Sequence, residues 1–480
     1  MSWYNSIIVP PDTTPPTAPT GLAGGSGNPT ELFLNWNAAT DNVGVSGYYV
    51  FRNGENIGTT GTLYYQDSGL TEATVYTYML EAFDLAGNVS LPSAPVDVQT
   101  TNVTPPTTPG NVVANAVACT KANVTWSAST DNTGVTEYLV WMGLSPNSLA
   151  QVAVVRGSTT SYGDNTLSPA TTYYFGVQAE DKNRNISAMS AIASATTPAL
   201  PVAPSGVSAE ADSTSRISVT WSASTGGLPI ARYLVYRGAS VATLAQVAVV
   251  NNTSYTDTSA AASTTYYYAV EAVDTGTPPA QSGLSLPASA TTFSPPSAPA
   301  NVTATPVSSS KIDLTWSAST SGGLPIANYR VYGGTSPASL SQIGITLNTS
   351  YNDVSLAAGT TYYYAVQAAD TAYDDSALSN TVAATTLQLP SAPSNVVAQG
   401  TSSSEIAVSW SPSSGALPIA YYYVFRGASP SNMSQVATTV NPSYNDKSLS
   451  VGTTYYYGVQ AVDTAGDLSP VSSAVPGTTL

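Results

Sequence analysis

The composition of this chain argues against several classes of function. It has 480 residues and a formal net charge of −16, because only 12 residues are Lys or Arg while 28 are Asp or Glu. Binding to nucleic acid or to anionic membranes needs clustered basic side chains, so we expect neither. The chain contains no histidine, the commonest general base and metal ligand. It also lacks the run of about 20 apolar residues that membrane insertion requires.

The first thirteen residues differ from the rest of the chain. Residues 1–13 form a predicted N-terminal tail with an apolar, β-forming segment that Pro10 and Pro11 end. The segment lacks the features of a secretory signal. We interpret it as a strand that pairs with a sheet edge on another copy of the protein. The alternatives are a strand folded against the first domain and the remnant of a longer precursor. The candidate self-assembly residues are Trp3, Tyr4, Ile7, Ile8 and Val9.

A unit of roughly 95 residues then occurs five times. In each copy, a predicted strand alternates apolar and polar residues and ends in tryptophan, as in Leu32–Trp36. This period of two indicates a strand with one buried face. A second strand with the pattern Tyr-x-Val follows, as in Tyr48–Phe51, and later a tyrosine-rich strand such as Tyr76–Ala82. The tryptophans recur at spacings of 90, 95, 95 and 94 residues: Trp36, Trp126, Trp221, Trp316 and Trp410.

These units resemble fibronectin type III domains. The tryptophan matches strand B of that family and the Tyr-x-Val phrase matches strand C. Leu70 and Tyr76 match its tyrosine corner, in which the tyrosine hydroxyl bonds to upstream backbone; the third unit departs from this pattern with Ala260 in place of the leucine. The amino-acid sequence of the first unit is similar to type III modules of bacterial secreted proteins, including modules attached to polysaccharide-degrading enzymes.

The resemblance implies an all-β chain of five tandem immunoglobulin-like (fibronectin type III) β-sandwiches. Short proline-rich linkers, such as the one at Pro105 and Pro106, stiffen the connections, so we expect an extended rod. The predicted domains are residues 14–102, 103–198, 199–293, 294–387 and 388–480.

No catalytic, cofactor or metal site is recognisable in the sequence. A glycosidase needs two carboxylates facing each other, whereas the regular acids here occur singly, after the tyrosine-rich strand of each unit. We interpret them as formers of Asx turns. The order Asp84-x-x-Gly87-Asn88 resembles part of a calcium loop, but the number and spacing of ligands fall short. Cys119 is expected to be a small buried side chain. The regular acids are Asp84, Asp181, Asp274, Asp370 and Asp463.

One set of aromatic residues exceeds what a core needs. In strand C, Tyr48 and Val50 alternate inward, so Phe51 is predicted to point outward, and the same alternation applies to strand F. The two strands are neighbours in the type III sheet, so cross-strand stabilisation and a contact surface are both open interpretations. The predicted outward aromatic face comprises Phe51, Trp141, Tyr174, Tyr236, Tyr267, Tyr332, Tyr363, Phe425 and Tyr456.

These observations favour a non-enzymatic structural protein without a cofactor. The first hypothesis is an extracellular or cell-surface rod that assembles with copies of itself into a fibre or appendage. The second is a polysaccharide-binding or adhesive array whose aromatic faces hold sugar rings. The third is a spacer or decoration of a virus particle. The fold alone does not decide between them, because type III sandwiches serve many roles.

Overall fold

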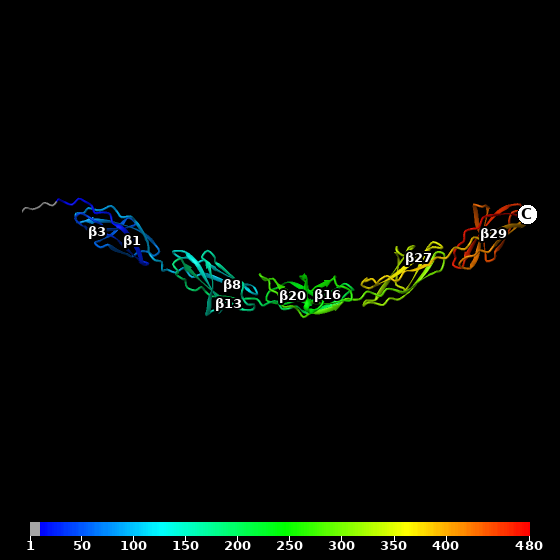
Figure 1. Ribbon diagram of the computed structural model, residues 1–480, viewed down its shortest axis with the longest axis horizontal. Helices are drawn as coiled ribbons and strands as arrows, with labels where there is room; N and C mark the ends of the chain where they lie inside the picture. The colour runs from blue at the N-terminus through cyan, green and yellow to red at the C-terminus, as the bar shows by residue number, and fades with distance from the viewer. Residues whose placement is uncertain (1–9) are drawn as a thin grey trace, which may run out of the picture. The chain divides into compact units, whose positions relative to one another are not determined.

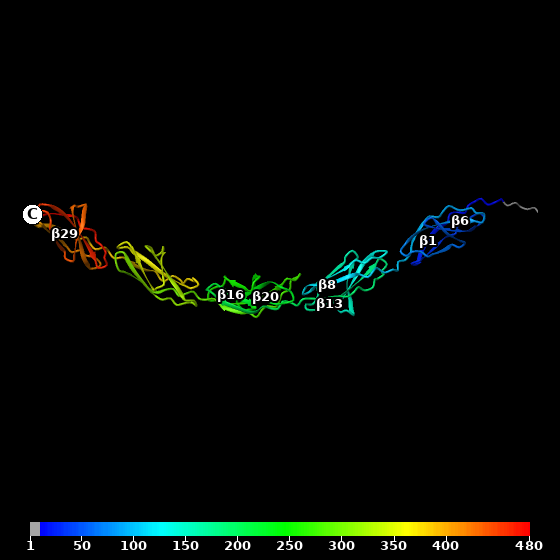
Figure 2. The ribbon, with the colours of Figure 1, turned by 180° about the vertical axis from the view of Figure 1, so that it is seen from behind.

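The chain is an all-β protein, as predicted. The computed structural model describes residues 10–480, in which 35 strands form ten sheets and the helix is limited to a 3₁₀ turn at Val241–Thr243. Five domains follow one another, each with one three-stranded and one four-stranded sheet (Figure 1, and from behind in Figure 2). No helix in this part of the chain has the length and hydropathy to cross a bilayer. The candidate self-assembly residues Trp3, Tyr4, Ile7, Ile8 and Val9 lie outside the described residues.

The strand order is the same in every domain. In the first domain the three-stranded sheet has the order β1 (Thr20–Asn28), β2 (Glu31–Asn37), β5 (Tyr64–Ser68). Its four-stranded sheet has the order β4 (Glu55–Thr60), β3 (Val45–Arg52), β6 (Val75–Asp84), β7 (Val96–Gln99). The other domains are given in the same way, with the three-stranded sheet first. The second has β12 (Ser161–Asp164), β9 (Lys121–Ser127), β8 (Gly110–Ala118) and β11 (Ser148–Arg156), β10 (Val135–Ser145), β13 (Thr172–Asp181), β14 (Ala193–Thr196). The third has β15 (Ser205–Ala211), β16 (Ile217–Ser222), β19 (Ser254–Asp257) and β18 (Ala245–Val250), β17 (Ile230–Gly238), β20 (Thr265–Asp274), β21 (Ala288–Thr291).

The last two domains repeat this order. The fourth has sheets β22 (Ala300–Pro306), β23 (Lys311–Ser317), β26 (Ser350–Val354) and β25 (Ser341–Thr346), β24 (Ile326–Gly334), β27 (Thr361–Asp370), β28 (Val382–Thr385). The fifth has β29 (Ser394–Ser402), β30 (Glu405–Ser411), β33 (Ser443–Lys447) and β32 (Asn432–Thr439), β31 (Ile419–Ser429), β34 (Thr454–Asp463), β35 (Val475–Thr478).

The alternating pattern of each tryptophan strand accounts for the core. In β2, Leu32, Leu34 and Trp36 are buried between the sheets, while the residues between them face outward. Trp36 packs edge-on against Tyr48, with ring centroids 5.3 Å apart and planes at 71°, a favourable arrangement for two aromatic rings. The same tryptophan–tyrosine pair recurs in the second, fourth and fifth domains. The repeated tryptophan is therefore a packing residue.

The tyrosine corner forms in all five domains. Each corner hydroxyl accepts a hydrogen bond from a backbone N–H five residues upstream, and this bond fixes the crossover between the sheets. In the third domain, where Ala260 replaces leucine, Ala261 N still donates to Tyr266 Oη at 3.1 Å. The substitution has not broken that corner. The other four bonds run from Thr71 to Tyr76, Ser168 to Tyr173, Ala357 to Tyr362 and Ser450 to Tyr455.

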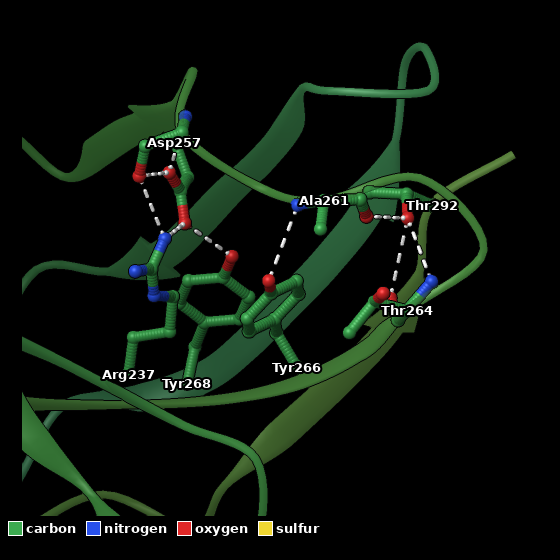
Figure 3. A network of polar contacts seen from close by, with 8 residues as sticks. Arg237, Asp257, Ala261, Thr264, Tyr266, Tyr268 and Thr292 are labelled. Atoms are coloured by element: carbon green, nitrogen blue, oxygen red, sulfur yellow. Dashed lines mark hydrogen bonds and ion pairs between the residues drawn. The ribbon is translucent and has the colours of Figure 1, made fainter.

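A buried carboxylate links the two sheets of the third domain beside this corner (Figure 3). Asp257 on β19 is fully buried and accepts hydrogen bonds at 2.7 Å from Arg237 Nη1 on β17 and from Tyr268 Oη on β20. The Arg237 guanidinium also lies 4.9 Å from the centre of the Tyr266 ring, within reach of a cation–π contact. The network therefore ties the corner to the core. Equivalent networks are Arg52–Asp67–Tyr78 and Arg426–Asp446–Tyr457.

Acid should weaken the third domain through Asp257. Burial raises the pKa of this carboxyl, but hydrogen bonds from Ser259, Tyr268 and Arg237 favour the ionised form and leave its pKa below the ordinary value. A carboxyl with a lowered folded-state pKa stabilises a protein above its unfolded pKa, about 3.9, and this stability is lost as pH falls through the folded value. We expect the difference in thermal midpoint between the chain and its Asp257→Asn variant to narrow below about pH 4. An undiminished difference at pH 2 would contradict this assignment.

Candidate functional site

The predicted outward aromatic face lies on the four-stranded sheets. All nine of its residues are half-buried, neither enclosed in a core nor freely exposed. In the second domain Trp141 is opposite Gly176, and Tyr174 is opposite Gly143, so the two rings are diagonal neighbours. The fourth and fifth domains have the same offset. The rings are offset diagonally and do not directly face each other, and their role in contacts stays a prediction.

The fifth domain has a longer aromatic row than the sequence predicted. Tyr421, Tyr423 and Phe425 alternate along β31 and are all half-buried. Neighbouring ring centroids are 5.3 Å and 6.5 Å apart, with planes at 64° and 75°. The hydroxyl oxygens of Tyr421 and Tyr423 are 3.3 Å apart. This row is apolar along its length and carries hydrogen-bonding groups at one end.

A hollow on the three-stranded sheet of the first domain brings two further aromatics to the surface. It has a volume of about 340 Å³ and is lined by Gly24 and Gly25 of β1, Phe33 and Asn35 of β2 and Tyr64 of β5. The Phe33 and Tyr64 rings are 5.9 Å apart, with planes at 23°. Tyr64 is 46% exposed. Gly25 faces open space and has no side chain to cover the hollow, so nearly parallel rings and an exposed amide line one shallow site.

These two aromatics are absent from the other domains. The position of Phe33, three residues before the tryptophan, is Asn, Ser, Asp or Ala elsewhere, and the position of Tyr64 is always Ser. Four domains therefore fold with the same topology without them. Neither residue belongs to the pattern that the five units share, so that pattern did not predict them; their departure from the other four copies was the available signal. The equivalent residues are Asn123, Ser218, Asp313 and Ala407, and Ser161, Ser254, Ser350 and Ser443.

The regular acids have the turn-forming role that was predicted. All five are buried, and each accepts a hydrogen bond from a backbone N–H of the loop that follows it. Cys119 is 1% exposed, and its Sγ lies 3.2 Å from Asp274 Oδ2. Burial, together with this carboxylate, raises the pKa of the Cys119 thiol to about 11. The thiol thus stays protonated at neutral pH and is a poor nucleophile.

The family of these domains follows from comparison with known proteins. Residues 297–385 and 391–478 match the model of the fibronectin type III domain. The chain contains tandem fibronectin type III domains. The first three units have the same two-sheet topology as the two that match.

Similar proteins are found among bacterial enzymes. The chain is 38% identical over 279 residues to exoglucanase B of Cellulomonas fimi, an overlap of 55% of this chain and 24% of the relative. It is 35% identical over 285 residues to exoglucanase A of the same organism, covering 55% of this chain and 31% of the relative. It is 40% identical over 212 residues to chitinase A1 of Niallia circulans, covering 42% of this chain and 28% of the relative. The chain thus spans less than a third of each relative.

The first functional hypothesis is wrong. The sequence alone favoured a self-assembling structural fibre, but these relatives are exoglucanases and a chitinase. The sequence evidence for the fibre was the apolar N-terminal segment together with the outward aromatic faces, and neither feature specifies its partner. The relatives favour the second hypothesis, which concerned polysaccharide.

Proposed function

We propose that this chain is a non-enzymatic, extracellular array of fibronectin type III domains that contacts polysaccharide. The observation that carries the proposal is the hollow of the first domain, in which Phe33 and Tyr64 lie nearly parallel beside Asn35. The other four domains have no aromatic residue at either position, so folding does not require these side chains. They are therefore available for a role in binding.

The chemistry of the hollow suits a pyranose ring. The C–H faces of a sugar are apolar and leave water when they stack on an aromatic ring. The side-chain amide of Asn35 offers both a donor and an acceptor to sugar hydroxyls. A site with apolar walls and a few polar groups is the usual form of a small-ligand site, and a volume of about 340 Å³ lies in the expected range. The hollow thus fits one or two sugar units of a polymer.

The relatives support a polysaccharide partner. Their names refer to glucans and chitin, which are polymers of pyranose sugars. Because the chain covers less than a third of each relative, the shared region need not include their catalytic parts. Sugar contact by an accessory array is consistent with both facts. A secreted array of this kind would contact the polymer outside the cell.

Retention on insoluble polymer tests this proposal. The full chain should bind to microcrystalline cellulose or to chitin, and Tyr64→Ser, which installs the residue of the other four domains, should weaken binding about tenfold, equivalent to about 1.4 kcal/mol. Phe33→Asn, which installs the residue of the second domain, should act in the same direction. Val440→Ser removes an apolar side chain that is 74% exposed in the fifth domain and is the matched control. Failure of the unaltered chain to bind either polymer, or equal binding by Tyr64→Ser, would contradict the proposal.

The aromatic row of the fifth domain is a second candidate contact. Tyr423 lies between Tyr421 and Phe425, so Tyr423→Ala interrupts the row at its centre. We expect this variant to weaken polymer binding less than Tyr64→Ser does, because the rings of the row are steeply tilted toward one another and offer no shared plane. The two variants are compared in the same retention assay. A larger effect of Tyr423→Ala would move the principal contact to the fifth domain.

A further inference from the structure

Three carboxylates converge at one end of the first domain. Asp12 precedes β1, Asp41 lies in the loop between β2 and β3, and Asp84 ends β6. One oxygen atom from each residue lies within 4.8 Å of the oxygens from the other two. Three segments far apart in the sequence thus place their charges in one small volume.

In two of these carboxylates, only one of the two oxygens accepts a hydrogen bond. Asp12 Oδ1 accepts from Thr14 N and Asn42 Nδ2 at 3.1 Å and 3.2 Å. Asp41 Oδ2 accepts two backbone N–H bonds at 2.8 Å from the loop that follows it. The remaining oxygens, Asp12 Oδ2 and Asp41 Oδ1, each expose less than 1 Å² and have no hydrogen-bond partner. A carboxylate oxygen that is both buried and unpartnered is costly, so its presence in two neighbouring residues indicates a missing positive group.

No basic side chain supplies that positive charge. None of the ion pairs found within residues 10–480 includes Asp12, Asp41 or Asp84. Asp84 is 3% exposed, and its two oxygens accept hydrogen bonds from the backbone N–H and the side chain of Asn88 at 2.8 Å and 2.7 Å. Neutral donors orient these carboxylates but do not cancel their mutual repulsion, which is strong at such separations near a protein surface.

The second domain has an amide in place of one of the three carboxylates. Its equivalent positions are Asn102, Asp131 and Asp181, so asparagine replaces the first of the three carboxylates. Asn102 Nδ2 donates to Asp181 Oδ2 at 2.6 Å. The cluster there has two acids and one donating amide, although Asp131 Oδ2 is also buried without a hydrogen-bond partner. The first domain has a third carboxylate, Asp12, where the second has this donor, so its cluster carries one more negative charge and lacks the bond that the amide makes.

We propose that Asp12, Asp41 and Asp84 bind a calcium ion. Carboxylate oxygens without nitrogen or sulfur ligands favour hard cations. Calcium accepts irregular sets of oxygen ligands and completes its coordination with water, whereas magnesium demands near-ideal octahedral geometry. The half-exposed Asp12 and Asp41 leave room for such waters. The ion would fasten the segment around Asp12 to two loops at this end of the domain, independently of the hollow that holds Phe33 and Tyr64.

Calorimetric titration of the full chain with calcium chloride tests the site. One ion should bind, with a dissociation constant of about 0.1–1 mM, which is typical of extracellular calcium modules. Asp12→Asn recreates the arrangement of the second domain, so it should fold normally and lose the ion. The reciprocal variant Asn102→Asp should gain a second ion. In thermal unfolding with a chelator, Asp12→Asn is expected to be at least as stable as the unaltered chain, because it has one carboxylate fewer in the cluster. This result would confirm that any loss of binding is local.

The outcomes separate clearly. Binding of one ion by the unaltered chain, none by Asp12→Asn and two by Asn102→Asp supports the site. Unchanged calcium stoichiometry in Asp12→Asn, or no heat of binding by the unaltered chain, would overturn it. A parallel titration with magnesium chloride should show weaker binding, and equal affinity for magnesium would overturn the assignment to calcium.

Discussion

Replacing Asp257 with alanine is expected to destabilise the third domain by about 3 kcal/mol. The fully buried carboxylate accepts hydrogen bonds from Arg237 and Tyr268, and the variant leaves the Tyr268 hydroxyl buried without its partner. The Arg237 side chain is 24% exposed, so water can solvate part of the freed charge. The loss should therefore lie at the lower end of the range for broken buried ion pairs.

The second domain provides the matched control for this prediction. Asp164 occupies the equivalent position, but Met142 and Phe175 stand where the third domain has arginine and tyrosine. Asp164 keeps the local turn bonds to Thr166, just as Asp257 keeps those to Ser259. It also accepts a hydrogen bond of 3.2 Å from Tyr162 Oη on its own strand. Asp164→Ala should thus cost about 1 kcal/mol. Hydrogen exchange of the full chain, resolved by peptide, measures both domains separately. Equal losses in the two would show that arginine and tyrosine add nothing.

The strands and their buried faces were predictable because both depend on local alternation. A residue of a sandwich strand points either into the core or away from it, so the pattern around Trp36 determined its face without knowledge of its partners. Phe51 and Trp141 lie half-buried on the four-stranded sheets, outside the core, and their role as a contact face stays a prediction. The sheet topology followed from the resemblance to type III domains, and the structure agrees with it.

Contacts across strands and between loops were less accessible to sequence reasoning. The sequence indicates that Trp141 and Tyr174 lie on neighbouring strands, but only the register shows that a glycine faces each ring. Asp12 was assigned to an N-terminal tail, although it bonds to Asn42 in the loop after β2. Its approach to Asp41 depends on how that segment returns to the domain, which no periodicity encodes. A comparison of the five copies position by position would have singled out Asp12 against Asn102.

Replacing Ile312 with alanine is expected to destabilise the fourth domain by about 2–5 kcal/mol. Ile312 is fully buried and packs in the core with Trp316 and Tyr364. The loss of the side chain leaves a cavity, because the two sheets that pack around Ile312 can move together only partly to fill the space. The adjacent Asp313 points outward, is 35% exposed and pairs only with Lys311. Asp313→Ala is therefore the matched control and should change stability by about 1 kcal/mol or less.

The second domain makes this prediction more informative, since it has alanine, Ala122, at the position of Ile312. Its core also contains Phe175 in place of a tyrosine, and Met142 packs against the same cluster. A flexible methionine fills irregular gaps, so alanine is accommodated there by a different set of neighbours. The fourth domain has Gly333 at the position of Met142 and offers no such filling. Peptide-resolved hydrogen exchange should show a large loss for Ile312→Ala. A loss no greater than that of Asp313→Ala would mean that the cores of the repeated domains are interchangeable residue by residue.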